Sequence, residues 1–302
     1  MIKMRRCLVT GGAGFIGSHL VDRLVQENHK VTILDNLSST NGKIPDYMNN
    51  NAEFILGDIR DDNLLKKIMP GKETIFHNAS AVGIAQSNYE ISHFVDMNCN
   101  GTAKILNAII DAKSKPKFIL SASNTTYGEG IYSCNNCGIF HPKIRGLKEI
   151  IEYGFEPVCP TCKKAGKAVP TPELTALNCN SVYALTKKFQ EELAFNIGIL
   201  NDFPVIVLKY FNVFGPRQSL SNPYTGVSAI FMSRIKSGNI PLLYEDGLQT
   251  RDFISVYDVV EANMLAMSNE KANNQVFNVG SGKPVTIKSL IEKISYFYEK
   301  KI

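Results

Sequence analysis

The feature that most constrains this chain is a glycine-rich turn near its start. A short apolar segment, RRCLVT, runs directly into GGAGFIGSHL, in which Gly11, Gly14 and Gly17 lie three residues apart. Gly12, Gly14 and Gly17 also satisfy the pattern G-x-G-x-x-G. Glycines at these spacings allow a tight strand-to-helix turn and let a pyrophosphate approach the backbone at the helix N-terminus. The pattern therefore predicts a parallel α/β sheet with a dinucleotide at its first turn.

An acidic residue at the end of the next apolar segment indicates which dinucleotide is bound. The segment KVTIL ends in Asp35, eighteen residues past Gly17. A carboxylate at this place accepts hydrogen bonds from the adenosine ribose hydroxyls and repels a 2′-phosphate. We therefore expect NAD rather than NADP, the alternative being a glycine turn followed by a surface aspartate without a ligand.

Short β-branched segments alternate with segments of helical period along most of the chain, which predicts a doubly wound parallel sheet of Rossmann type. The expected strands are RRCLVT, KVTIL, EFILGD, TIFHNA, KFILSA and VIVLKY. The expected helices cover residues 15–27, 96–112 and 181–198, with two more near 226–238 and 258–269.

The domain organisation follows from where this alternation breaks. Residues 131–172 lose the long apolar period and are rich in Cys, Gly, Pro and Lys, so we expect an insertion there. We place an NAD-binding domain at residues 1–210, the insertion within it, and a smaller substrate-binding lobe at 211–302.

A tyrosine and a lysine four residues apart form the candidate catalytic pair. Tyr183 and Lys187 lie in SVYALTKKFQEELAF, so both side chains emerge on one face of a helix. An adjacent ammonium and a positively charged nicotinamide would both lower the pKa of the phenol. A plain surface pair is the alternative, but the upstream strand KFILSA places Ser121 and Ser123 at the carboxyl end of the sheet, where ligands bind.

Composition excludes several classes of protein. The formal charge of +5 is mild and no run of like charges marks a nucleic-acid tail, so we expect no nucleic-acid partner. No stretch of about 18 apolar residues could span a membrane, and the N-terminus lacks the apolar region of a signal peptide. We therefore expect a cytoplasmic protein with no membrane partner.

Two CxxC pairs in the insertion predict a zinc site. Cys134 and Cys137 are separated by twenty-one residues from Cys159 and Cys162, and four thiolates at this spacing supply tetrahedral ligation. Such a closed site has no open position for a substrate, so we expect structural zinc, with His141 as an alternative ligand. Because the insertion lies between Ser123 and Tyr183, we hypothesise that it covers the mouth of the site and shapes substrate choice or a subunit contact.

Several motifs together resemble the extended short-chain dehydrogenase/reductase family. They are TGGAGFIGSHL, LDNLSS, GDIRD, SASNTTYG, YALTK and KYFNVFGPR. Within the family the set resembles the NAD-dependent nucleotide-sugar epimerases and dehydratases. A narrower resemblance, to the zinc-ribbon-bearing branch that includes dTDP-L-rhamnose 4-epimerases, rests on the insertion text together with GPRQSLSNPYTG and YEDGLQTRDF.

The resemblance assigns roles to matched positions. It implies Tyr183 as catalytic base, Lys187 as its pKa partner and nicotinamide-ribose ligand, and Ser123 as the hydroxyl that bridges to substrate. Asn98 resembles the asparagine that supports this lysine. The implied NAD contacts are Gly11, Gly14, Phe15, Ile16, Gly17, Asp35, Asn36, Asp58, Ile59, Asn98 and Lys187. The implied substrate contacts are Ser123, Asn212, Arg217 and Arg251, the two arginines facing the diphosphate.

The activity that the resemblance implies is 4-epimerisation of a dTDP- or UDP-linked hexose or 6-deoxyhexose through a 4-keto sugar, without net redox. A dehydratase is disfavoured because Asn124 and Thr125 follow Ser123 where the 4,6-dehydratases place Asp-Glu. A decarboxylase of the same family, and a non-catalytic NAD- or nucleic-acid-binding member, remain alternatives. Related epimerases commonly form homodimers, and they usually continue past the last segment seen here, so we also expect a homodimer and a shortened C-terminal lobe.

Overall fold

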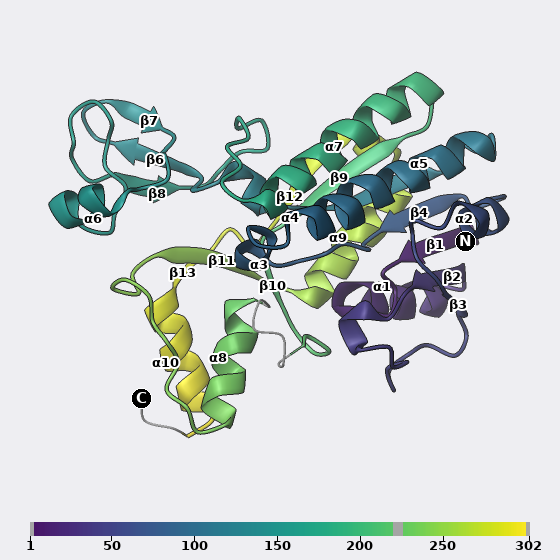
Figure 1. Ribbon diagram of the computed structural model, residues 1–302, viewed down its shortest axis with the longest axis horizontal. Helices are drawn as coiled ribbons and strands as arrows, with labels where there is room; N and C mark the ends of the chain where they lie inside the picture. The colour runs from purple at the N-terminus through teal and green to yellow at the C-terminus, as the bar shows by residue number, and fades with distance from the viewer. Residues whose placement is uncertain (1–2, 220–225, 300–302) are drawn as a thin grey trace.

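A computed structural model describes residues 3–219 and 226–299 (Figure 1). Its centre is a sheet of seven strands in the order β12-β9-β5-β4-β1-β2-β3, and every neighbouring pair is parallel. The strands are β1 (Arg6–Thr10), β2 (Lys30–Asp35), β3 (Glu53–Leu56), β4 (Thr74–His77), β5 (Lys117–Ser123), β9 (Val205–Tyr210) and β12 (Gln275–Val279). The order reverses between β1 and β4, which is the switch point at which such sheets bind ligands.

Helices cover both faces of this sheet. One face carries α1 (Phe15–Gln26) and α9 (Val256–Ser268), and the other carries α2 (Asp62–Ile68), α5 (Gly101–Asp111) and α7 (Val182–Asn201). Each face has its own core, since Leu20 and Val259 pack on one side and Ile105 and Ala194 on the other. The strands are apolar on both sides because both sides are buried, as parallel sheets require. The predicted doubly wound fold is confirmed.

The predicted helix over residues 96–112 is in fact two elements of different type. A π-helical turn, η2 (Val95–Asn100), runs without a break into α5. Just before it lie two single turns, α3 (Ile84–Ser87) and α4 (Ile91–Phe94). A π-helical turn adds one residue to the helical repeat and so reorients the side chains that follow it, which is why such turns occur at functional sites.

The second lobe has a small sheet in the order β10-β11-β13. Its strands are β10 (Asn212–Phe214), β11 (Thr250–Ser255) and β13 (Pro284–Thr286), and its helices are α8 (Val227–Lys236) and α10 (Ile287–Phe297). The two helices pack on each other through Phe231, Ile235, Ile291 and their neighbours. Not all of residues 211–302 lie in this lobe, because α9 packs on α1 and β12 completes the central sheet beside β9. Two elements that follow residue 210 therefore belong to the first domain. A single boundary at residue 210 could not place them, because the periodicity of hydrophobic residues does not show which sheet an element joins.

The insertion is a unit of its own at the upper left of Figure 1. Three short antiparallel strands, β6 (Ile131–Cys134), β7 (Gly138–Phe140) and β8 (Lys167–Val169), form its sheet, and α6 (Leu147–Tyr153) lies beside them. The remaining short turns of the chain are η1 (Ser38–Thr40), η3 (Asn124–Tyr127) and η4 (Glu270–Ala272). Among the described residues, no helix combines the length and apolar character needed to span a bilayer.

Candidate active site

A cavity of about 600 Å³ runs along the carboxyl edge of the central sheet and continues beneath the second lobe. It is lined by the turns that follow β1, β2, β4, β5 and β9, and by Phe253 of β11 on the opposite side. Most of the predicted site residues line it: Gly11, Gly14, Phe15, Ile16, Gly17, Asp35, Asn36, Ile59, Ser123, Tyr183, Lys187 and Asn212. We call this cavity the cleft.

The glycine turn has the shape that a phosphate site needs. Gly11 has a φ of +70°, and a Cβ there would lie 2.7 Å from the backbone nitrogen of Ala79. A Cβ on Gly17 would lie 2.2 Å from the Gly11 carbonyl oxygen, so helix α1 can approach the turn only without a side chain at this position. The helix N-cap is Gly14, which has no side chain to satisfy the first amide groups. These amides, together with the positive end of the helix dipole, suit a pyrophosphate.

Asp35 ends β2 inside the cleft, with 7% of its surface exposed. One carboxylate oxygen accepts from the Ala13 amide at 2.9 Å and the other from the Leu37 amide at 2.8 Å. Burial raises the pKa of this carboxyl, while the two amides act against that rise. Two bonds leave lone pairs free for ribose hydroxyls, and a carboxylate here would repel a 2′-phosphate, so the residues fit NAD.

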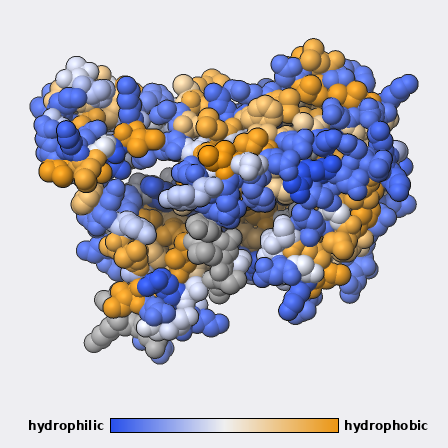
Figure 2. Space-filling model, in the orientation of Figure 1, coloured by the Kyte–Doolittle hydropathy of each residue, from blue (hydrophilic) through white to orange (hydrophobic). Residues whose placement is uncertain are grey.

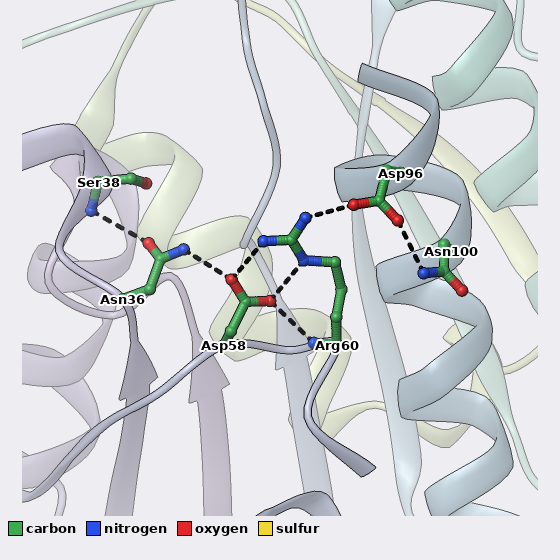
Figure 3. A network of polar contacts seen from close by, with 6 residues as sticks. All are labelled: Asn36, Ser38, Asp58, Arg60, Asp96 and Asn100. Atoms are coloured by element: carbon green, nitrogen blue, oxygen red, sulfur yellow. Dashed lines mark hydrogen bonds and ion pairs between the residues drawn. The ribbon is translucent and has the colours of Figure 1, made fainter. Parts of the chain in front are cut away.

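Asp58 lies outside the lining of the cleft and is engaged by other side chains (Figure 3). Arg60 binds both of its oxygens, at 2.8 and 2.7 Å, and Asn36 donates to one of them at 3.0 Å. The second arm of Arg60 pairs with Asp96 on η2. The Arg60 guanidinium lowers the pKa of Asp58 to about 2. The role of Asp58 as a cofactor contact therefore stays a prediction, and its observed role is to tie the turn after β3 to η2.

Ser123, Tyr183 and Lys187 converge at the end of β5. The Ser123 side chain lies close enough to the Tyr183 hydroxyl to lower the pKa of the phenol, and its oxygen accepts from the Thr125 hydroxyl at 2.9 Å. Helix α7 holds the pair in place because Ser181 caps it and the Lys187 ammonium donates to the Ser121 carbonyl at 2.9 Å. The three predicted catalytic residues thus face one point of the cleft from two elements.

Burial controls the ionisation of this pair. Desolvation raises the pKa of Tyr183 to about 12 and lowers that of Lys187 to about 7. Lys187 Nζ lies 5.9 Å from the centre of the Tyr183 ring, and the expected lowering of the phenol's pKa by the lysine stays a prediction. Burial disfavours both charged forms, so an additional positive charge in the cleft is needed to favour the phenolate.

Asn98 lies beneath the cleft at zero exposure, in the π-helical turn. Its side-chain oxygen accepts from the Ala81 amide at 2.8 Å and from Ser80 at 3.0 Å, and its amide donates to Thr186 at 2.9 Å. It therefore supports the neighbour of Lys187 rather than the lysine itself. Its role as a direct NAD contact stays a prediction.

The predicted substrate residues are distributed unevenly. Asn212 lines the cleft and donates to the Asp252 carbonyl at 3.1 Å. Arg217 turns away, pairing with Asp22 of α1 at 2.8 Å and lying over the Tyr47 ring. Arg251 is exposed on β11 and donates to the carbonyl of Thr250, its own neighbour, at 2.7 Å. Neither arginine lines the cleft in this structure, so both diphosphate contacts stay predictions.

The sequence analysis missed the loop that follows β4. Residues 78–84 line the middle of the cleft, between the glycine turn and Ser123. The signal was present, because TIFHNA was assigned as a parallel strand and loops at the carboxyl ends of such strands form ligand sites. The loop contains no charged side chain that would mark it as a site in the sequence. Its residues are uncharged: Asn78, Ala79, Ser80, Ala81, Val82, Gly83 and Ile84.

The four cysteines of the insertion come together as predicted. Their sulfur atoms all lie within 4.8 Å of one another, and those of Cys134 and Cys162 are 3.4 Å apart. Tetrahedral zinc with bonds of about 2.3 Å requires sulfur atoms about 3.8 Å apart. The cluster therefore has the size that zinc ligation requires. His141 is not part of it.

The insertion stands beside the cleft and does not line it. Figure 2 shows it as a knob at the upper left, with an open gap between it and the rest of the molecule. Among the described residues of the cleft lining, none belongs to residues 131–170. The insertion instead contacts the second lobe through Arg145, which lies 3.6 Å from Glu245 and 4.0 Å from Glu129 at the insertion's base. Its hypothesised effect on sugar choice stays untested.

Comparison with known proteins agrees with this geometry. The model of the NAD dependent epimerase/dehydratase family matches residues 7–139 and 157–280, leaving out only part of the insertion and the two ends. This chain belongs to that family. The predicted membership of the extended short-chain dehydrogenase/reductases is confirmed, and NAD is the cofactor of the family.

Three proteins illustrate the similarity. The dTDP-L-rhamnose 4-epimerase of Burkholderia thailandensis is 31% identical, over 99% of this chain and 82% of the relative. The UDP-N-acetyl-alpha-D-glucosaminuronate decarboxylase of Bacillus cytotoxicus is also 31% identical, over 96% of this chain and 79% of the relative. The crystal structure of UDP-glucose 4-epimerase with UDP-glucose from Thermotoga maritima superposes with a TM-score of 0.81 at 32% identity, covering 98% of this chain and 84% of that one. The family therefore fixes the enzyme type, whereas these relatives differ in the reaction.

Proposed function

We propose that this protein is a 4-epimerase of a nucleotide-diphosphate sugar whose hexose or 6-deoxyhexose carries no carboxylate. The observation that carries the proposal is the convergence of Ser123, Tyr183 and Lys187 in a cleft that begins at a phosphate-binding turn. Similarity to a dTDP-L-rhamnose 4-epimerase and to a UDP-glucose 4-epimerase supports it. The nucleotide, dTDP or UDP, is left open.

The mechanism assigns one task to each residue. NAD, which the glycine turn and Asp35 would hold, would supply the acceptor for the hydride of carbon 4 and the donor that returns it to the opposite face. Tyr183 takes the proton of the 4-hydroxyl and gives it back, which requires its phenolate for part of the cycle. Ser123 lies beside the Tyr183 hydroxyl and holds the sugar oxygen there. Lys187, anchored on the Ser121 carbonyl, favours the phenolate when it is protonated.

The chemistry of the cleft lining disfavours the two other reactions of the family. Asp35 is the only acidic residue of the described lining, and it lies at the end of β2 beside the glycine turn. The lining residues that follow Ser123 are Asn124 and Thr125, which carry no acidic group. A dehydratase needs an acid there to expel water. Lys187 is the only lysine or arginine of the same lining, and it is engaged by Ser121. A uronate decarboxylase would need a cation to hold the sugar carboxylate.

One experiment tests the reaction. The purified protein is incubated with NAD in heavy water in two separate reactions, one with dTDP-L-rhamnose and one with UDP-galactose. The products are followed by NMR. We expect the 4-epimer of one of them, with no deuterium at carbon 4 and no accumulating NADH, because the hydride returns internally. Loss of water from UDP-galactose would identify a dehydratase instead, and release of carbon dioxide from a UDP-linked uronate in a parallel incubation would identify a decarboxylase. Absence of any product with NAD bound would favour the non-catalytic alternative.

We also propose structural zinc at Cys134, Cys137, Cys159 and Cys162. The support is the spacing of the sulfur atoms and the small core around them, which consists of Cys134, Cys159 and Cys162 with Phe140 and Tyr132. Small units of this kind commonly need a metal to fold. Metal analysis of the purified protein should give one zinc per chain, and a Cys159→Ser variant should give less.

A homodimer is proposed from the surface of α7 and η2. These elements pack together with α4, and they leave Leu185 and Phe189 of α7, Val95 of η2 and Ile91 of α4 at least 44% exposed. Leu185 and Phe189 are one helical turn apart, so they form a continuous apolar stripe. Light scattering should give twice the mass of one chain, and Phe189→Lys should halve it. The predicted cytoplasmic location stays a prediction.

A further inference from the structure

His77 is buried at the end of β4 and belongs to no part of the proposed chemistry. Its two ring nitrogens meet Thr10 at 2.8 Å and Thr102 at 2.9 Å, and its ring packs against Phe118. Burial, with a smaller contribution from the charge of Lys187, lowers the pKa of His77 to about 3. The imidazole is therefore neutral near pH 7 and carries a single N–H, which must lie on one nitrogen or the other.

The hydroxyl of Thr102 decides which nitrogen carries the hydrogen. Thr102 donates its one hydrogen to the Asn98 carbonyl at 2.7 Å, and it accepts from the Gln190 amide at 2.6 Å. Its oxygen can only accept from His77, so His77 Nε2 is the protonated nitrogen. Nδ1 is then an acceptor, and the Thr10 hydroxyl donates to it. This Nε2–H assignment follows from counting donors and acceptors.

The resulting chain of hydrogen bonds has a fixed direction. It starts at the Ala79 amide, which donates to the Thr10 hydroxyl at 3.2 Å, passes through His77 and Thr102, and ends on the Asn98 carbonyl. Thr10 is the last residue before the glycine turn, and Ala79 lines the cleft. The chain thus joins the phosphate-binding turn to the π-helical turn through the interior of the sheet.

The same chain fixes both ends of the cleft loop, residues 78–81. Thr10 holds the Ala79 amide, and the Asn98 side chain holds Ser80 and both polar groups of the Ala81 backbone. Asn98 also donates to the Thr186 hydroxyl, and Thr102 accepts from Gln190, so two residues of α7 on either side of Lys187 are held by the network. The loop and the catalytic helix are therefore positioned by one buried set of polar contacts.

We propose that His77, as the neutral Nε2–H tautomer, is a positioning residue that keeps the cleft loop and α7 in the arrangement that binds NAD. With the opposite tautomer, Nδ1–H would face the Thr10 hydroxyl and Nε2 would face a hydroxyl with no hydrogen to give. Either the Asn98 carbonyl would then lose Thr102 as a donor, or Nε2 would be left without a hydrogen-bond partner. The proposal rests on NAD as the occupant of the cleft and not on which sugar is turned over.

The tautomer is tested on the unmodified protein without added NAD. Protein labelled with 15N-histidine gives long-range proton–nitrogen correlations for its five histidines, and a His77→Gln spectrum identifies the signals of His77. We expect a protonated Nε2 and an unprotonated Nδ1 at every pH between 6 and 8. A protonated Nδ1, or titration of the ring in this range, would overturn the assignment.

The positioning role is tested by removing one hydroxyl. Thr102→Val leaves His77 and Gln190 without an acceptor, so we expect the Kd for NAD to rise about 10-fold, the size of one net hydrogen bond to a buried group. Thr102→Ser should stay within twofold. Thr74→Val is the matched control, because Thr74 is buried in the same strand as His77 and its hydroxyl has no partner among the described residues.

Two outcomes would overturn the role. One is a Thr102→Val protein that melts at a lower temperature yet binds NAD as tightly as Thr102→Ser, since a purely structural hydroxyl would behave in this way. The other is an equal loss of NAD affinity in Thr74→Val. If Thr102→Val does not fold, Thr10→Val against Thr10→Ser poses the same question at the other end of the chain.

Discussion

The central sheet and the insertion bury their polar groups in different ways. In the sheet, His77, Thr10 and Thr102 are surrounded by two large apolar cores and satisfy one another. The insertion has strands of three and four residues and a core of Cys134, Phe140 and Cys159 with two partly buried neighbours. The fraction of apolar surface that is buried rises with the size of a folded unit. The central domain can therefore offset the burial of its hydrogen-bonded side chains, whereas we expect the insertion to depend on the zinc bound by its cysteines.

Zinc removal should have the largest effect on folding, and it should unfold the insertion without changing NAD binding by the central domain. Structural zinc sites in small units contribute roughly 10 kcal/mol or more of folding free energy, so Cys159→Ser or a strong chelator should unfold the insertion. We expect proteolysis confined to residues 131–170 and a Kd for NAD within twofold of the parent. Loss of NAD binding on chelation would show that the two regions are coupled.

Tyr183→Phe should have the opposite pattern, with catalysis lost and the insertion unchanged. It removes the hydroxyl that faces Ser123 and leaves the buried ring in place. General acid–base catalysis contributes about 10²- to 10⁴-fold, so kcat should fall by roughly 10³-fold. Zinc content and melting temperature should stay as in the parent. Asn196→Gln, an exposed change on the same helix, serves as the control for kcat.

Acid should weaken the partly exposed ion network of Asp58, Arg60 and Asp96 below about pH 4 (Figure 3). Arg60 lowers the pKa of Asp58 from 3.8 to about 2, so the stability from this pair is complete above pH 4 and is lost as the pH falls towards 2. Asp58 is partly exposed, and solvent screening limits the contribution to about 1 kcal/mol or less. Urea unfolding at pH 6 and pH 3 should show a smaller acid loss for Arg60→Gln than for the parent. An equal loss in both proteins would assign the acid sensitivity to other groups.

Arg145→Ala should give the smallest effect, at the contact between the insertion and the second lobe. The Arg145–Glu245 and Arg145–Glu129 pairs are 3.6 and 4.0 Å long, and pairs of this kind contribute about 0.5 kcal/mol. Amide hydrogen exchange should increase in residues 240–250 and at the base of the insertion, with kcat unchanged. Lys148→Ala, exposed on α6 and without an ion pair among the described residues, should leave exchange as in the parent. A change in kcat would instead support an effect of the insertion on catalysis.

Local patterns were enough to predict much of the fold and part of the site. The Gly11–Gly17 turn, the Tyr183–Lys187 pair and the four cysteines are fixed by spacing within one or two elements, and all of these came together as predicted. Long-range pairing was not predictable in this way. Arg217 turned to Asp22, and β12 returned to the central sheet, because the partners of each lie far away in the sequence.

The sequence by itself determined the order of strands and helices, the phosphate-binding turn, the catalytic pair and the cysteine cluster, because each depends on residue types at fixed local separations. Only the tertiary structure decided the ionisation and the direction of the polar groups. Burial set the pKa of Tyr183 above and that of Lys187 below their ordinary values. The tautomer of His77 depends on Thr10 and Thr102, from other elements, and desolvation and donor counting are properties of packed neighbours that a linear pattern does not contain.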